Sequence, residues 1–125
     1  MIVDDNPINQ IVIESLLKKD GHDVVLVSDG AQAVEAVQAG RFDLVLMDVQ
    51  MPVMDGVAAT RVIRRLASSV KDISVVALTA SVMAEDVKSC YDGGMNGYLA
   101  KPIDREQLRR AVTTWAGSDA IRDLQ

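Results

Sequence analysis

The sequence predicts one α/β domain of three layers, in which five parallel strands alternate with five helices. Short apolar runs alternate with longer amphipathic segments, which is the pattern of βαβ units. Each run ends at a polar or turn-forming residue, which marks the strand boundaries. At 125 residues the chain is long enough for one domain with a substantial core, which we place at residues 1–117. The polar segment 118–125 is expected to be a C-terminal tail or linker.

The central strand is predicted from Leu44 to Met47. This apolar run is unbroken and too short for a helix, which indicates a strand of a doubly wound sheet, covered by helices on both faces through right-handed crossovers. Asp48 ends the strand. Its carboxylate is therefore expected in the crevice beyond the strand ends, where open α/β sheets bind their ligands.

Four further strands are predicted from similar apolar runs. The first, residues 1–3, stops at Asp4 and Asp5, and most of it is missing from the sequence, so this strand is expected to be truncated. The other three are expected at residues 24–27, 73–78 and 97–100. Thr79 follows the fourth strand and Lys101 the fifth.

Each predicted helix starts at a side chain that can cap its N-terminus. The expected caps are Asn6, Asp29, Asp55, Ser81 and Asp104. Pro7 suits a first helical position, and the Gln three residues after Asp29 and after Asp104 resembles a capping box. The helices are expected to end near Gly21, Gly40, Leu66, Gly93 and Gly117.

Apolar residues at helical spacing indicate which face of each helix lies on the sheet. In the first helix they are Ile8, Val12 and Leu16, with Ile11 beside them. In the later helices they are Ala33, Val34, Val37, Val62, Ile63, Leu66, Leu108, Ala111, Val112 and Trp115. The arginines expected to face solvent are Arg61, Arg64, Arg65, Arg109 and Arg110.

The composition argues against several functions. The net charge is −5, and there is no basic stripe or series of aromatic residues, so direct binding of nucleic acid is not expected. No apolar stretch approaches the length of a membrane span, and no segment resembles a signal peptide, so the domain is expected to be cytoplasmic and to make no membrane contact. Cys90 is the only cysteine, and we expect it to be a small buried hydrophobe.

Because the carboxyl ends of parallel strands share one edge, Asp4, Asp5, Asp48, Thr79 and Lys101 are expected to meet there. Crowded carboxylates repel one another and raise each other's pKa values, and a hard divalent cation relieves this repulsion. Mg²⁺ suits the cluster, since it typically takes one or two carboxylates and a phosphate oxygen. The metal and the lysine would together neutralise the carboxylates, so the site is expected to accept a further anionic group.

At these positions the chain resembles the receiver domain of two-component response regulators. The resemblance spans residues 3 to about 115. The motifs that carry it are Asp4-Asp5, Asp48, Met54-Asp55-Gly56, Thr79-Ala80 and Lys101-Pro102. The expected strand order is the flavodoxin-like order 2-1-3-4-5.

The resemblance also implies a role for each site residue. Asp48 would be the phosphoacceptor, attacking the phosphorus of a phosphohistidine. Asp5, Asp48 and the backbone carbonyl of Gln50 would hold Mg²⁺, and Asp4 would act through a bound water. Lys101 would pair with an oxygen of the phosphate.

In this family a switch accompanies phosphorylation, and the resemblance assigns it to Thr79 and Tyr98. The threonine hydroxyl would turn toward the phosphate, and the tyrosine ring would rotate inward beside the small Ala80. The face made by the fourth helix, the fifth strand and the fifth helix would then change, and the domain would be a monomer or a weak dimer through that face. The Lys101-Pro102 bond is expected to be cis, as in the family.

Residues 6–10 and 94–103 most resemble receivers attached to hybrid sensor histidine kinases. The expected partners are therefore a sensor histidine kinase, a histidine phosphotransfer domain, or both. The domain alone is not expected to be an enzyme beyond its own phosphorylation and autodephosphorylation. The parent chain would be a histidine kinase, which allows for a membrane anchor elsewhere in it.

Other functions stay open at this point. A free-standing, single-domain response regulator would carry the same residues. Hydrolases of the haloacid dehalogenase type also use an aspartate nucleophile with Mg²⁺, but Asp48-Val49-Gln50 lacks the second acid of their D-x-D motif. A carrier of FMN would need a hydroxyl- and glycine-rich loop in place of Asp4-Asp5-Asn6-Pro7. A receiver that only docks partners would not need every site position filled.

Overall fold

The computed structural model describes the chain except residues 41, 52, 67–68, 81–82 and 118–125. The predicted cap Ser81 and the predicted tail therefore lie outside the described residues. Among the helices of the described ranges, none has the length and apolarity needed to cross a bilayer.

The sheet consists of β1 (Ile2–Val3), β2 (Leu26–Val27), β3 (Leu44–Asp48), β4 (Ser74–Thr79) and β5 (Gly97–Ala100). The helices are α1 (Pro7–Lys19), α2 (Gly30–Ala39), α3 (Gly56–Arg64), α4 (Ala84–Asp92) and α5 (Arg105–Val112). A 3₁₀ turn at Ser69–Asp72 precedes β4, and a π turn at Thr113–Gly117 follows α5. All strands are parallel, in the order β2-β1-β3-β4-β5, which confirms the predicted fold and the short first strand.

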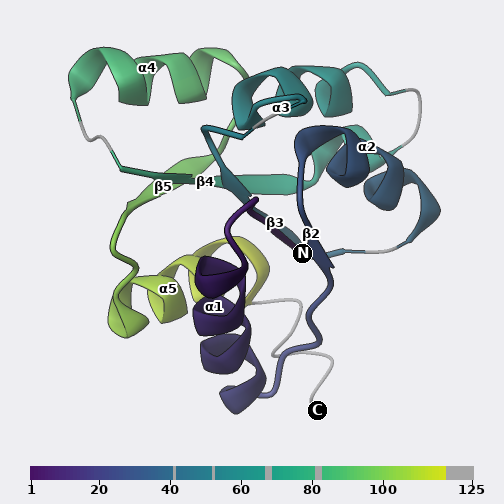
Figure 1. The fold of residues 1–125 in the computed structure, drawn as a ribbon. Coiled ribbons are helices and arrows are strands. Elements are labelled where there is room, and N and C mark those ends of the chain that lie inside the picture. The colour runs from purple at the N-terminus through teal and green to yellow at the C-terminus, as the bar shows by residue number, and fades with distance from the viewer. Residues whose placement is uncertain (41, 52, 67–68, 81–82, 118–125) are drawn as a thin grey trace.

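Helices α2, α3 and α4 cover one face of the sheet, and α1 and α5 cover the other (Figure 1). Successive residues of β3 point to opposite faces, as in any strand. Val45 and Met47 therefore pack with the first group of helices, and Leu44 and Leu46 with the second. This double burial explains why the strand is an unbroken apolar run. Cys90 is buried on the first face, as predicted.

Side-chain caps start four of the helices. The Asn6, Asp29 and Asp55 side chains accept hydrogen bonds from the backbone N–H of Ile8, Gln32 and Ala58 at 2.8–2.9 Å. Asp104 accepts one from the N–H of Gln107 at 3.2 Å. Helix α4 differs, since its N-cap is Met83, which makes no side-chain cap hydrogen bond.

The predicted inner face of α1 is wrong by about one residue. Ile8, Ile11 and Val12 are 70%, 59% and 47% exposed, whereas Ile13 and Leu17 are buried against the sheet. This helix carries apolar residues along two adjacent stripes. The helical spacing was therefore predicted correctly, but the sequence did not indicate which stripe faces the sheet. The exposed stripe therefore remains available to a partner.

Two smaller expectations also need correction. Strand β2 has two residues in place of the predicted four, because it lies at the edge of the sheet and pairs with the equally short β1. In α3, Ile63 is buried as predicted, but Val62 is 37% exposed because it lies beside the buried stripe.

Arg64 does not face solvent, contrary to prediction. Its Nε donates to the carbonyl of Gly94 at 2.9 Å, and its Nη1 donates to the carbonyls of Lys71 and Ile73 at 2.7 and 2.6 Å. Its Nη2 donates to Asn96 Oδ1 at 2.8 Å. The side chain thus joins the end of α3 to the segments that enter β4 and β5. Its acceptors are carbonyls of connecting segments, which leave no pattern in the sequence.

Candidate functional site

The predicted site residues meet at the carboxyl edge of the sheet. Asp48 ends β3 and Thr79 ends β4, while Asp4 and Lys101 directly follow β1 and β5. Asp4, Asp5 and Asp48 each place one carboxylate oxygen within 4.8 Å of the others. Residues that are far apart in the chain therefore form one cluster, as the shared edge of a parallel sheet predicts.

Lys101 supplies the positive charge of this cluster. Its Nζ lies 3.1 Å from Asp48 Oδ1 and 3.6 Å from Asp4 Oδ2. Its backbone N–H donates to the carbonyl of Thr79 at 2.7 Å, and the Lys101-Pro102 peptide bond is cis, as expected. The lysine is thus held between the ends of β1, β3 and β4.

Asp48 is almost completely buried, and burial raises the pKa of its carboxyl group above the ordinary value. The Lys101 ammonium opposes this shift, the nearby charge of Asp4 adds to it, and the backbone N–H of Gln50 opposes it. Lys101 and the N–H of Gln50 therefore compensate the ionised carboxylate only in part. An additional cation in the cluster would stabilise it.

The carboxylate of Asp4 is only partly satisfied by hydrogen bonds. Its Oδ1 accepts a hydrogen bond from the backbone N–H of Asn6 at 2.9 Å. Its Oδ2 is buried and has no hydrogen-bond partner, although Lys101 lies within ion-pair distance. Buried carboxylate oxygens without donors are costly, and the oxygen donors of this cluster are those that Mg²⁺ prefers. The residues present therefore fit the predicted magnesium ion.

A pocket of about 210 Å³ opens beside Asp48. Its lining includes Thr79 and Lys101, which were predicted, and the side of α4 that carries Asp86 and Ser89, which were not. These two residues are three positions apart on one helix and so share a face. Nothing in the sequence indicates that this face lies against the site. The pocket has room for an anionic group between the strand ends and α4.

Gln10 is a third residue that the sequence did not reveal as part of the site. Its Nε2 donates to the carbonyl of Asp4 at 2.6 Å and to the carbonyl of Val27 at 3.0 Å. The side chain therefore links α1 to the ends of β1 and β2, and it holds the backbone that carries the first two acids.

Tyr98 lies on β5 and is 40% exposed, while Thr79 is buried at the end of the neighbouring strand. The ring thus occupies an outer position in this structure. Both members of the predicted switch pair are on adjacent strands, which the pairing of Thr79 with Ala100 confirms.

Comparisons with known proteins agree with this geometry. Residues 1–113 match the family model of the response regulator receiver domain. The chain is 47% identical over 119 residues to the sensor protein GacS of Pseudomonas syringae, which covers 94% of this chain but only 13% of that protein. The chain thus spans a small part of this curated relative.

Two solved structures support the same relationship. One is the receiver domain of the sensor histidine kinase PA1611 from Pseudomonas aeruginosa, which has a magnesium ion coordinated in its active site cleft; it is 45% identical, with a TM-score of 0.86, and the match covers 93% of this chain and 94% of that one. The other is the receiver domain of Ssk1 from Saccharomyces cerevisiae, in complex with the histidine phosphotransfer protein Ypd1; it is 33% identical, with a TM-score of 0.86, and the match covers 95% and 88%. The chain belongs to the response regulator receiver domain family and so to two-component phosphorelay signalling.

Proposed function

We propose that Asp48 accepts a phosphoryl group from a phosphohistidine in a reaction that depends on Mg²⁺. The observation that carries this proposal is the buried Asp48 carboxylate, which lies beside Lys101 and faces a pocket large enough for a phosphoryl group. An oxygen of Asp48 would form the new bond to phosphorus as the bond from phosphorus to the histidine nitrogen breaks, and the imidazole would then take up a proton.

The acidic cluster would hold the metal. Asp5, Asp48 and the backbone carbonyl of Gln50 would be direct ligands, and Asp4 would act through a water. When bound, Mg²⁺ supplies positive charge that neutralises the oxygens of the transferring group. Lys101 would pair with one phosphoryl oxygen, and the Thr79 hydroxyl would donate to another. These residues position the group and stabilise its charge, which is most of what phosphoryl transfer requires.

We expect Mg²⁺ to stabilise the folded domain. Binding to the folded state alone contributes about 1.4 kcal/mol at ten times the dissociation constant, which for a domain of this size raises the melting temperature by about 4–8 °C. Thermal unfolding with and without millimolar MgCl₂ measures this. The shift should be lost in Asp5→Asn and kept in Asp43→Asn, an exposed acid that precedes β3. An identical melting temperature with and without the metal would contradict the proposed site.

Phosphorylation is proposed to change the face made by α4, β5 and α5 through Thr79 and Tyr98. Tyr98 starts from a partly exposed position, and Ala80 beside the pocket is small, which supports an inward rotation of the ring. The phosphoryl group would shift a population between two arrangements by preferring one of them.

We expect the phosphate mimic beryllium fluoride, added with Mg²⁺, to change amide hydrogen exchange in α4, β5 and α5 but not in α2. Hydrogen-exchange mass spectrometry measures the change. Asp48→Asn with the same additives is the control and should show none. Equal exchange of the wild-type domain in both states would remove the switch from the mechanism.

The partner proposed to deliver or receive the phosphoryl group is a histidine phosphotransfer domain. The exposed stripe Ile8, Ile11 and Val12 of α1 lies beside a pocket of about 200 Å³ whose lining includes Pro102 and Ile103. Lys101 lines this pocket as well as the one beside Asp48, so the apolar patch borders the phosphoacceptor. Exposed apolar patches of this kind mark protein interfaces. The complex of a similar receiver with Ypd1 supports a partner of this class.

We expect Ile11→Gln to slow phosphoryl transfer from a histidine phosphotransfer domain by at least about tenfold, since removing a central apolar contact costs more than about 1.4 kcal/mol. Labelling by acetyl phosphate, a small donor that needs no docking surface, should be unchanged. Val62→Gln, at an exposed apolar position of α3, is the control. Equal transfer rates for the wild type and Ile11→Gln would place the partner on another surface.

The parent protein is proposed to be a hybrid sensor histidine kinase, with this domain in the cytoplasm. The identity to GacS along nearly the whole chain supports this assignment over a free-standing response regulator. The domain itself would act only in its own phosphorylation and autodephosphorylation.

A further inference from the structure

A second polar groove lies near the amino ends of the strands, on the side of the sheet opposite to the carboxyl edge that carries Asp48. It has a volume of about 360 Å³ and is lined by Arg61, Arg64, Arg65, Asp92, Gly93 and Gly94. Helices α3 and α4 start near the carboxyl edge that carries Asp48 and run back along the sheet, so their last turns lie near the amino ends of the strands. The groove therefore shares no residue with the site at Asp48.

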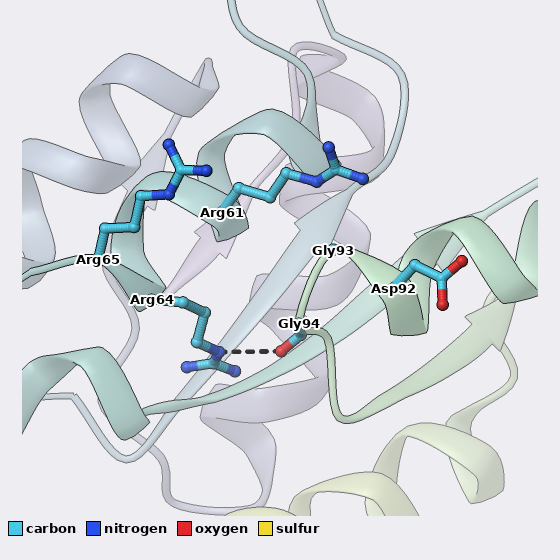
Figure 2. A pocket seen from close by; sticks show the side chains of 6 residues that line it. All are labelled: Arg61, Arg64, Arg65, Asp92, Gly93 and Gly94. Carbon is cyan, nitrogen blue, oxygen red and sulfur yellow. Dashed lines mark hydrogen bonds between the residues drawn. The ribbon is translucent and has the colours of Figure 1, made fainter.

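Three arginines line this groove, and their guanidinium groups point in different directions: that of Arg64 lies beside Gly94, whereas those of Arg61 and Arg65 lie on the other side (Figure 2). Arg61 and Arg65 are exposed, and within the described ranges neither forms an ion pair with a carboxylate. Asp92 lines the groove as well, but its carboxylate points away from the Arg64 guanidinium (Figure 2). In a chain with a net charge of −5, this is a local excess of positive charge, which Asp72 and Asp92 compensate only in part.

The charge of Arg64 adds to the effect. Its hydrogen-bond acceptors are all neutral: the carbonyls of Gly94, Lys71 and Ile73 and the side-chain oxygen of Asn96. Burial lowers the pKa of this guanidinium, and the charge of Asp72 only partly opposes that shift. Because these acceptors carry no charge, they do not neutralise the Arg64 guanidinium. Its positive charge therefore attracts an anion toward the groove.

The Gly93-Gly94 turn brings the end of α4 close to the arginines. A Cβ on Gly93 would lie 2.7 Å from Val57 Cγ1, and one on Gly94 would lie 2.9 Å from Arg64 Cγ. Gly94 also has a φ of +101°, which other residues rarely adopt. Side chains at these two positions would therefore force the turn away from α3.

We propose that this groove binds a dianionic phosphate group, either inorganic phosphate or the phosphate of a nucleotide, through Arg61 and Arg65. Arginine suits this ligand because its planar group donates two parallel hydrogen bonds to a phosphate. The negative end of the α3 dipole opposes an anion by about 0.3–1 kcal/mol, which is less than the contribution of one charge-assisted hydrogen bond, about 1.5–3 kcal/mol. Arg61 lies in the last turn of α3 and Arg65 is its C-cap, so bound phosphate would lie against the end of that helix.

The test is a titration of the ¹⁵N-labelled chain with inorganic phosphate, followed by NMR at constant pH and ionic strength. EDTA keeps metal away from the acidic cluster. We expect saturable shifts of the Gly93 and Gly94 amide signals and of Arg64 Nε–H. In the double variant R61Q/R65Q the affinity should fall at least about tenfold, the effect of losing one charge-assisted hydrogen bond. The matched control R105Q/R110Q removes two exposed arginines of α5 and should bind as the wild type does.

Equal affinity in R61Q/R65Q and the wild type would overturn the proposal, as would shifts that do not saturate or that occur only around Lys101. A second titration with AMP identifies the source of the ligand. Tighter binding of AMP than of inorganic phosphate would support the site as one for a nucleotide. Equal or weaker binding of AMP would support it as one for free phosphate.

Discussion

Asp48→Asn is expected to abolish the incorporation of phosphate from acetyl phosphate in the presence of Mg²⁺. The amide has the size of the carboxylate, but it offers no anionic oxygen to attack phosphorus. Asp4, the other buried acid of the cluster, accepts a hydrogen bond from Asn6 through one oxygen and faces Lys101 with the other. The readout is phosphate that is stable to acid and labile to base, as an acyl phosphate is. Undiminished labelling of Asp48→Asn would reject Asp48 as the phosphoacceptor.

Measuring the free energy of unfolding of Asp48→Asn separates a loss of labelling from a loss of folding. Because burial raises the pKa of Asp48, the folded state binds its proton more tightly than the unfolded state does. Without metal, the stability of the wild type should therefore fall as the pH rises from the ordinary pKa of an aspartate through the raised value. Asp48→Asn removes this fall and should be at least as stable as the wild type at neutral pH. Asp43→Asn, at an exposed position, should keep the labelling of the wild type.

The sequence was sufficient to predict which residues meet at the carboxyl edge, because that geometry follows from the type of sheet. Once the runs before Asp48 and Thr79 are recognised as parallel strands, both residues must lie at one edge, and the ends of β1 and β5 bring Asp4 and Lys101 to it. No side-chain detail enters that inference. The ion pair between Lys101 and Asp48 at 3.1 Å is consistent with it.

Two kinds of feature could not be predicted: which apolar stripe of a helix faces the sheet, and which side chains donate hydrogen bonds to backbone carbonyls. In α1, apolar residues occupy two stripes, and only contact with the sheet selects Ile13 over Val12. Arg64 was expected to face solvent because arginine usually does, whereas its partners are carbonyls that no sequence pattern reveals. The approach of Asp86 to the pocket likewise depends on how α4 lies on the sheet.

Gly56→Ala is expected to destabilise the domain and to disturb the site at the same time. Gly56 is the first residue of α3, and it packs directly on the end of β3. A Cβ there would lie well inside van der Waals contact of the backbone oxygen of Asp48, and 2.9 Å from Met47 Cγ. The backbone N–H of Gly56 also donates to the carbonyl of Val49 at 2.9 Å, so the loop after Asp48 is held to the helix start. Overpacking of this kind costs about 1–3 kcal/mol, and more where backbone must move.

Because the atom in the way is part of the Asp48 backbone, relief of the clash would displace the strand end that carries the phosphoacceptor. We therefore expect a lower free energy of unfolding in urea and, at temperatures where the variant is still folded, slower labelling by acetyl phosphate. Gly40→Ala is the control, since its tightest contact would be with the ring of Phe42, at 3.2 Å, and Gly40 is the exposed C-cap of α2, which precedes the start of β3 and not the end that carries Asp48. It should change the stability by less than about 1 kcal/mol and leave the labelling rate unaltered. If Gly56→Ala lowered the stability but kept the wild-type labelling rate, the helix start would support the fold alone, and the position of Asp48 would depend on its strand neighbours.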